Sequence, residues 1–127
     1  MQDLIAFTEA RLDEEEEAAQ DTARGNPGPW SLDHAWIRDA TGETVVMDEY
    51  RWGGSAFTHI ARYDPARVLR EVAAKRARLD AYIAANAAVQ RHGDLYMTGV
   101  AHGLAVAVKG DAASWDNHPD YKQAWAP

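Results

Sequence analysis

The chain has 127 residues, 46% of them hydrophobic, which suits one compact domain with a substantial core. It has no cysteine, so disulfides, thiol nucleophiles, zinc fingers and iron–sulfur clusters are excluded. The formal net charge of −7 argues against general binding to nucleic acid. The N-terminus lacks the features of a signal peptide, and no apolar run approaches the roughly 20 residues that span a bilayer, so we predict a cytoplasmic protein outside the membrane.

Charge is unevenly distributed along the chain. Residues 1–24 carry eight acidic and two basic side chains, a net charge of −6, whereas residues 62–92 carry seven basic and three acidic ones, a net charge of +4. The two segments can attract each other, and the second can form a local basic face.

The first predicted element is a helix over residues 2–23. Its short apolar stripe consists of Leu4, Ile5, Phe7 and Leu12. Four glutamates follow at residues 14–17 without an apolar partner, and we interpret them as solvated surface rather than as a site for a divalent cation. Gly25 marks the end of the helix.

The stretch NPGPW at residues 26–30 must end that helix, because each proline fixes φ and keeps its predecessor out of the α region. Two interpretations are open: a rigid corner that places Trp30 in a helix–sheet core, or a recognition loop that presents the ring. We favour the corner, and a buried Trp30 predicts that Trp30→Ala costs about 3 kcal/mol of stability.

A small antiparallel sheet is predicted next. Residues 30–38 and 44–48 form two strands, joined by a hairpin turn in which Gly42 takes a positive φ. Residues 50–54 add a short third strand before the glycines break it. A sheet of two or three strands is marginal on its own, so it must pack on helices.

Two helices follow the sheet. A short helix covers residues 55–63, and a long one begins at Pro65, with Asp64 as its N-cap, and ends near Arg91. The apolar face of the long helix is made of Val68, Leu69, Val72, Leu79, Tyr82, Ile83 and Asn86. At the rise of an α-helix it is about 40 Å long, so we predict that part of it packs on a second subunit.

Residues 95–109 are apolar and contain Gly99 and Gly103. They form either a helix packed closely through its glycines or a strand, and we favour the helix. The predicted domain spans residues 1–115, and residues 116–127 form a polar and aromatic tail that docks only through its tryptophans. The predicted fold class is α+β, with an acidic N-terminal helix, a small antiparallel sheet, a short helix, a long alanine-rich helix and a C-terminal helical segment.

No constellation for catalysis is visible in the sequence. It has no nucleophile elbow, Walker loop or dinucleotide-binding glycine motif, and its acidic residues crowd one helix end or lie scattered in turns. We interpret His59 as a half-buried polar residue that shares a helix face with Tyr63, and His102 as a hydrogen-bonded core residue. We therefore assign no catalytic residue, metal ligand or cofactor, and a minor hydrolase or nuclease that uses His59 is the enzymatic alternative.

The basic stretch that starts at Arg62 is the best candidate for binding. Its simpler interpretation is a solvated helix face with salt bridges, such as one between Glu71 and Lys75. The sharper one is an aromatic pocket with adjacent arginines that binds a nucleotide-like anion. The residues of this candidate site are Trp30, Trp36, Trp52, His59, Arg62, Arg67 and Arg70. Asp64 would repel an anion from the start of the long helix.

Three stretches of the sequence carry a resemblance to a known family. They are NPGPW, the block THIARYDPARVLREVAAKRARLD at residues 58–80 and the closing NHPDYKQAW at residues 117–125. Together they resemble a family of short proteins of unknown function from actinobacteria and their phages. The middle block more loosely resembles Ead-like prophage proteins, which share the PGPW corner and an alanine-rich helix that starts at proline. Asn26 departs from the usual Thr or Ser. The resemblance implies a phage or prophage context and brings no activity, substrate or catalytic residue.

These observations lead to two functional predictions. The first is a non-catalytic, phage- or prophage-associated interaction protein that forms a homodimer and binds a host or phage macromolecule through its long helix. The second is a small-ligand protein that binds a nucleotide-like anion in a tryptophan-lined pocket with adjacent arginines. Membranes are not expected as partners, and the net charge argues against nucleic acid.

Overall fold

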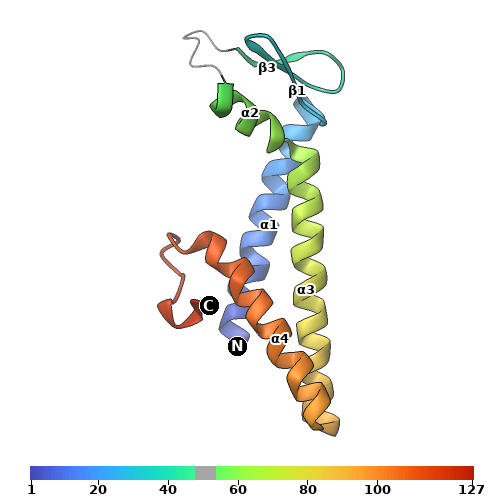
Figure 1. Cartoon of the computed structure of the whole chain (residues 1–127), viewed down its shortest axis with the longest axis vertical. Coiled ribbons are helices and arrows are strands. Elements are labelled where there is room, and N and C mark those ends of the chain that lie inside the picture. Colours follow the sequence, from blue (N-terminus) through green and yellow to red (C-terminus); the bar gives the residue numbers. More distant parts are fainter. Residues whose placement is uncertain (48–53) are drawn as a thin grey trace. The chain divides into compact units, whose positions relative to one another are not determined.

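The computed structural model describes residues 1–47 and 54–127 (Figure 1). Within that part of the chain, four α-helices and a three-stranded antiparallel sheet form an α+β fold, which confirms the predicted fold class. The chain makes two compact units, the first of Met1–Asp13 with Ala73–Pro127 and the second of Glu14–Val72. None of the helices in the described residues is long and apolar enough to cross a membrane.

The helices follow the pattern predicted from the sequence. Their bounds are α1 Gln2–Gly25, α2 Gly54–Arg62, α3 Pro65–His92 and α4 Leu95–Ala112, and two short 3-10 turns follow as η1 Ala113–Trp115 and η2 Gln123–Trp125. Residues 95–109 are helical, which confirms the helix that was favoured over a strand. The predicted packing of that helix through its glycines is wrong, because a Cβ at Gly99 or Gly103 would meet nothing within 4 Å. His102, predicted in the core, is exposed because it lies on the same outward side of α4.

The sheet follows the order β1–β2–β3. Its strands are β1 Ser31–Asp33, β2 Trp36–Arg38 and β3 Thr44–Met47. The prediction of one strand over residues 30–38 is wrong, because the chain reverses at His34, whose φ of 55° is left-handed. Gly42 has the predicted positive φ, at 87°, and Ile37 in the middle strand is fully buried. The third strand predicted at residues 50–54 lies outside the described residues except for Gly54, which begins α2.

In the second unit, the NPGPW corner packs on the start of α3. A Cβ placed on Gly28 would lie 2.8 Å from the Ala66 Cβ, so the corner approaches α3 more closely than a side chain at this position allows. The Trp30 backbone N–H donates to Asp64 Oδ2 at 2.9 Å, and its indole Nε1–H donates to the Asn26 carbonyl oxygen at 2.9 Å. The predicted corner is present, but Trp30 is half-buried rather than in a core, because its indole turns back to its own loop.

In the first unit, the C-terminal region packs on the start of α1. The Phe7 ring contacts four other rings, those of Trp115, His118, Tyr121 and Trp125. Phe7 and Trp125 are both buried. The tail therefore docks through Trp125, but the prediction that only tryptophans dock is wrong, because His118 and Tyr121 contact the Phe7 ring as well.

Ion pairs join the helices of the first unit. Arg78 Nε and Nη2 donate to the two carboxylate oxygens of Asp111, each at 2.7 Å, and thereby connect α3 to α4. The bond to Asp111 raises the pKa of Arg78 above its ordinary value, so this guanidinium stays charged. Asp13 accepts a hydrogen bond from Arg76 Nη2 at 2.6 Å, a contact of the kind that the acidic first helix and the basic long helix predict.

Candidate functional site

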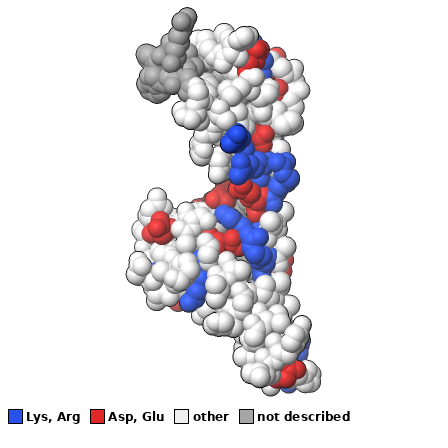
Figure 2. Space-filling model, viewed as in Figure 1, with Lys and Arg blue, Asp and Glu red and all other residues white. Residues whose placement is uncertain are grey.

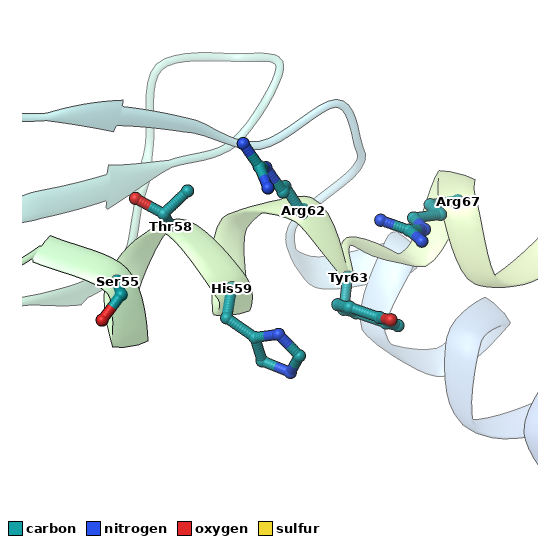
Figure 3. A pocket seen from close by; sticks show the side chains of 6 residues that line it. All are labelled: Ser55, Thr58, His59, Arg62, Tyr63 and Arg67. Carbon is teal, nitrogen blue, oxygen red and sulfur yellow. The ribbon is translucent and has the colours of Figure 1, made fainter.

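An open hollow with a volume of about 550 Å³ lies where α2 meets α3 (Figure 3). The side chains that line it are Ser55, Thr58, His59, Arg62, Tyr63 and Arg67. They come from α2, from the turn after it and from the first turn of α3. Each of these side chains can donate a hydrogen bond, and two are permanently positive, so the hollow suits an anionic ligand rich in acceptors.

Three lining residues follow one another at four-residue steps. The His59 and Tyr63 ring centroids are 4.6 Å apart, which confirms the predicted i, i+4 contact, and the Arg67 guanidinium lies 4.3 Å from the centre of the Tyr63 ring. Figure 3 shows these side chains in sequence along one side of the chain. The prediction that His59 is half-buried is wrong: it is exposed, because its ring rests on Tyr63 and not on a core.

Arg67 shares its charge with a neighbour on α3. Its Nε donates to Glu71 Oε1 at 2.8 Å, and this hydrogen bond raises the pKa of Arg67 above its ordinary value. The partner of Glu71 is therefore Arg67, where the sequence pattern predicts Lys75. Because of this ion pair, Arg67 contributes less positive charge to the hollow than a lone guanidinium would.

Asp64 holds the turn between α2 and α3. Its Oδ1 accepts the Arg67 backbone N–H at 2.8 Å, which confirms it as the N-cap of α3, and its Oδ2 accepts the Trp30 backbone N–H. Asp64 is buried and does not line the hollow. The corner thus uses both oxygens of this carboxylate internally and fixes the backbone from which Tyr63 and Arg67 extend.

Arg62 is the cation of the hollow that is most available to a ligand. It is exposed, and no carboxylate of the described residues lies within ion-pair distance of it. The neighbouring Tyr63 is 46% exposed. A guanidinium offers bidentate hydrogen bonds and an aromatic ring offers a stacking surface, so the pair can hold a ligand that is planar at one end and anionic at the other.

The structure brings together three of the seven predicted site residues, which are His59, Arg62 and Arg67. Arg70 is exposed on α3 but lies outside the lining of the hollow. Sequence reasoning missed Ser55, Thr58 and Tyr63 as lining residues. The signal was present, because Ser55, His59, Tyr63 and Arg67 continue one four-residue period through the turn between the helices.

The predicted tryptophan-lined pocket does not form around the hollow. Trp30 is half-buried in the corner, and Trp36 is half-buried in β2 with the Arg38 guanidinium 5.5 Å from its ring centre. Neither tryptophan lines the hollow. The third predicted tryptophan, Trp52, lies outside the described residues.

The described side chains that line the hollow are hydrogen-bond donors, and two of them are cations. No carboxylate stands among the described residues that line the hollow, so its hydroxyls and imidazole have no acidic partner there. Among residues 1–47 and 54–127, no three His, Asp or Glu side chains are grouped to hold a metal ion, and this includes the acidic run at residues 14–17.

Comparison with known proteins places the whole chain in one family. The family model described as a family of unknown function, DUF6221, matches residues 1–127. The chain belongs to DUF6221. No curated protein and no solved structure matches it. In this DUF6221 chain, two of the stretches that carry the resemblance noted above meet in space, since Gly28 and Trp30 of NPGPW pack on Ala66 and Asp64 of the central block.

Proposed function

We propose that this DUF6221 protein acts by binding, without chemistry of its own, and that the hollow at α2 and α3 takes the anionic group of a small ligand. The observation that carries the proposal is the exposed Arg62 beside Tyr63, in a hollow whose described lining lacks a carboxylate. A guanidinium with no ion-pair partner among the residues that the structure describes is ready to form a bidentate hydrogen bond with a phosphate or carboxylate.

The lining favours a nucleotide-like anion with a planar ring and a phosphate group. Tyr63 and His59 supply aromatic surface on which a ring can stack. The hydroxyls of Ser55 and Thr58 supply further donors for phosphate oxygens. The volume of about 550 Å³ also suits a small molecule, since such sites span roughly 300–1,000 Å³.

Isothermal titration calorimetry with AMP, adenosine and inorganic phosphate tests this ligand class. We expect AMP to bind more tightly than adenosine, because the phosphate meets Arg62. Arg62→Ala should weaken AMP binding about tenfold, the loss expected for one charge-assisted hydrogen bond.

Arg70→Ala is the matched control for Arg62→Ala. Arg70 is also exposed and has no carboxylate of the described residues in ion-pair distance, but it does not line the hollow. The control should bind AMP like the wild type. Equal weakening by both variants, or equal affinity for AMP and adenosine, would contradict the proposed site.

A second candidate function is the binding of a host or phage macromolecule through α3, in the cytoplasm of an actinobacterial host. The observation that favours it is a run of small exposed side chains on this helix, those of Ala73, Ala74, Ala77, Ala81 and Ala84. Small side chains let another backbone approach closely. The resemblance to proteins of actinobacteria and their phages supports the phage or prophage context.

Native mass spectrometry of the protein purified gently from such a host separates the two candidates. An added mass of a few hundred daltons that is lost in Arg62→Ala supports the small ligand. An added macromolecule that is lost in Ala77→Glu, and kept in Arg62→Ala, supports the second candidate. Ala77→Glu is suitable because Ala77 is exposed, so the variant tests the surface and not the core.

A further inference from the structure

Helix α4 is apolar on both of its sides, although one side faces solvent. Its inward side includes the buried Ala101 and Val108. Its outward side carries Leu95, which is 90% exposed, Tyr96, which is 77% exposed, and Val106, which is 51% exposed. A helix that is hydrophobic all round belongs in an interior, so the outward side of α4 calls for a cover that the described chain does not supply.

Seven of the eight exposed residues of α4 form one continuous face. At 100° per residue these seven fall within about a third of the helix circumference, and we call them the outward face; the eighth, the polar Thr98, adjoins it. Its members are Leu95, Tyr96, Gly99, His102, Gly103, Val106 and Gly110, all of them exposed. The face runs the length of α4, about 27 Å.

The glycines of the outward face are not required for packing against the described residues. A Cβ at Gly99, Gly103 or Gly110 would meet nothing within 4 Å. Glycine is the weakest helix former after proline, so three glycines in one helix weaken it without any gain in packing inside the chain. They are explained if another backbone approaches the helix from outside.

The outward face also lacks charge. No Asp, Glu, Lys or Arg occurs from Leu95 to Val108, in a chain of which 26% is charged. Figure 2 agrees, since the surface over α4 is mostly white. An uncharged face offers nothing to a charged peptide or to a phosphate backbone, but it is complementary to another uncharged face, as in the core of a protein interface.

We propose that the outward face of α4 binds the same face of a second copy of the chain, antiparallel and around a two-fold axis. If the axis passes between His102 and Gly103, Leu95 of one copy lies opposite Gly110 of the other. Gly99 then lies opposite Val106, and His102 lies opposite Gly103. Leu95, His102 and Val106 each meet a glycine, so the two helices approach closely and interdigitate, while Tyr96 lies opposite Lys109 at the edge of the contact.

The antiparallel arrangement follows from the same positions. A parallel pair would place Leu95 against Leu95 and glycine against glycine. The interface would then be overpacked where large side chains meet and would contain voids where glycines meet. An antiparallel pair also aligns the two helix dipoles favourably. One pair of helix faces buries less than the roughly 1,600 Å² of a standard interface, so we expect a dimer that dissociates on dilution.

This inference is independent of the proposed anion site, because none of its residues lines the hollow. It also differs from the sequence-based prediction, which placed a second subunit on the long helix. Sedimentation equilibrium over a range of concentrations measures the dimer. Gly103→Leu should raise its dissociation constant roughly tenfold or more, because a side chain would fill the point of closest approach.

Two properties of Gly103→Leu separate a lost interface from a lost fold. Position 103 is open within the chain and leucine favours helix, so the dilute variant should melt no lower than the wild type. Ala77→Leu, on the exposed side of α3, is the matched control and should dimerise normally. A wild type that stays monomeric at all concentrations overturns the proposal, and so does a dimer that only Ala77→Leu disrupts.

Cysteine cross-linking tests the orientation, and the chain has no cysteine to interfere. Single cysteines next to the two-fold axis are neighbours across it, so His102→Cys should form a disulfide-linked dimer on mild oxidation. In the antiparallel register the two copies of Leu95→Cys are 15 residues apart along the helix, roughly 22 Å, which is too far for a disulfide. Cross-linking at position 95 without cross-linking at position 102 would overturn the register.

Discussion

Replacing Gly28 with alanine tests how the NPGPW corner holds the turn between α2 and α3. A Cβ at this position would lie 2.8 Å from the Ala66 Cβ, 3.2 Å from the Ala66 backbone nitrogen and 3.2 Å from Asp64 Cγ. The two atoms of Ala66 are fixed by the α3 backbone, so no side-chain rotation can relieve the contact. The corner must move away from the helix.

The expected loss of stability has two parts. Forcing an extra methyl group into a close contact costs about 1–3 kcal/mol. Moving the corner also stretches the hydrogen bond from the Trp30 N–H to Asp64, which contributes about 1 kcal/mol. Together these lower the free energy of unfolding by about 3 kcal/mol, and in a chain of 127 residues this lowers the Tm by roughly 10 °C.

Thermal unfolding followed by circular dichroism measures the effect. Gly25→Ala is the matched control from the same stretch of chain, because a Cβ at Gly25 would meet nothing within 4 Å. It should leave the Tm unchanged or raise it slightly, since alanine restricts the unfolded chain. A Gly28→Ala protein with the same Tm as the wild type would refute the close contact between Gly28 and Ala66. Equal losses in both variants would assign the effect to backbone flexibility.

Three further measurements test other contacts. The Thr41 hydroxyl donates a hydrogen bond to Asp39, and this bond is the largest of the effects that hold the pKa of the Asp39 carboxyl below its ordinary value. The ionised carboxyl therefore stabilises the fold at pH values above the ordinary pKa, and this contribution is lost as the pH falls through the lower pKa of the folded state. The Tm difference between wild type and Asp39→Asn should therefore shrink below about pH 4, and a constant difference would count against this assignment. A double-mutant cycle of Arg78→Ala and Asp111→Ala in urea should give a coupling of about 1 kcal/mol, whereas additive losses would mean that the bidentate pair contributes nothing. Phe7→Ala should cost about 3–5 kcal/mol and speed amide exchange at residues 118–125, and unchanged exchange would show that the tail is held by other contacts.

The helices were largely predictable because their signals act over a few residues. The pair Asp64 and Pro65 specifies the start of α3 through a side-chain cap and a fixed φ, and the structure starts the helix at Pro65. Its end at His92 is one residue beyond the predicted one. Gly42 likewise takes the positive φ that its turn requires.

The wrong predictions concern which other element of the fold packs against a given side chain. Trp30, His59 and His102 were all expected to be more buried than they are: Trp30 because a rigid corner would place it in the core, and His102 because its neighbours in sequence are small and apolar. Burial depends on the element that faces a side chain, and no local pattern reports it. The reversal at His34 was missed for a related reason: histidine adopts a left-handed φ only occasionally, and here the pairing of β1 with β2 requires it.

The candidate site also combines residues that local sequence predicts with a shape that depends on tertiary contacts. The basic residues Arg62 and Arg67 could be proposed from charge and helical spacing alone, whereas the hollow needed the turn that Asp64 and the corner hold. Trp30 and Trp36 do not line the hollow, since Trp30 turns toward its own loop and Trp36 lies in the sheet.

The sequence by itself determined the class of fold, the bounds of the helices, the corner at residues 26–30 and the absence of cysteine chemistry. These depend on covalent composition and on interactions within one or two turns of chain. Only the tertiary structure decided that Gly28 packs on Ala66, that the six lining residues share one hollow, and that the glycines of α4 face outward. Those outcomes depend on contacts between residues far apart in the chain, and the free energy of such contacts is settled only when whole elements pack together.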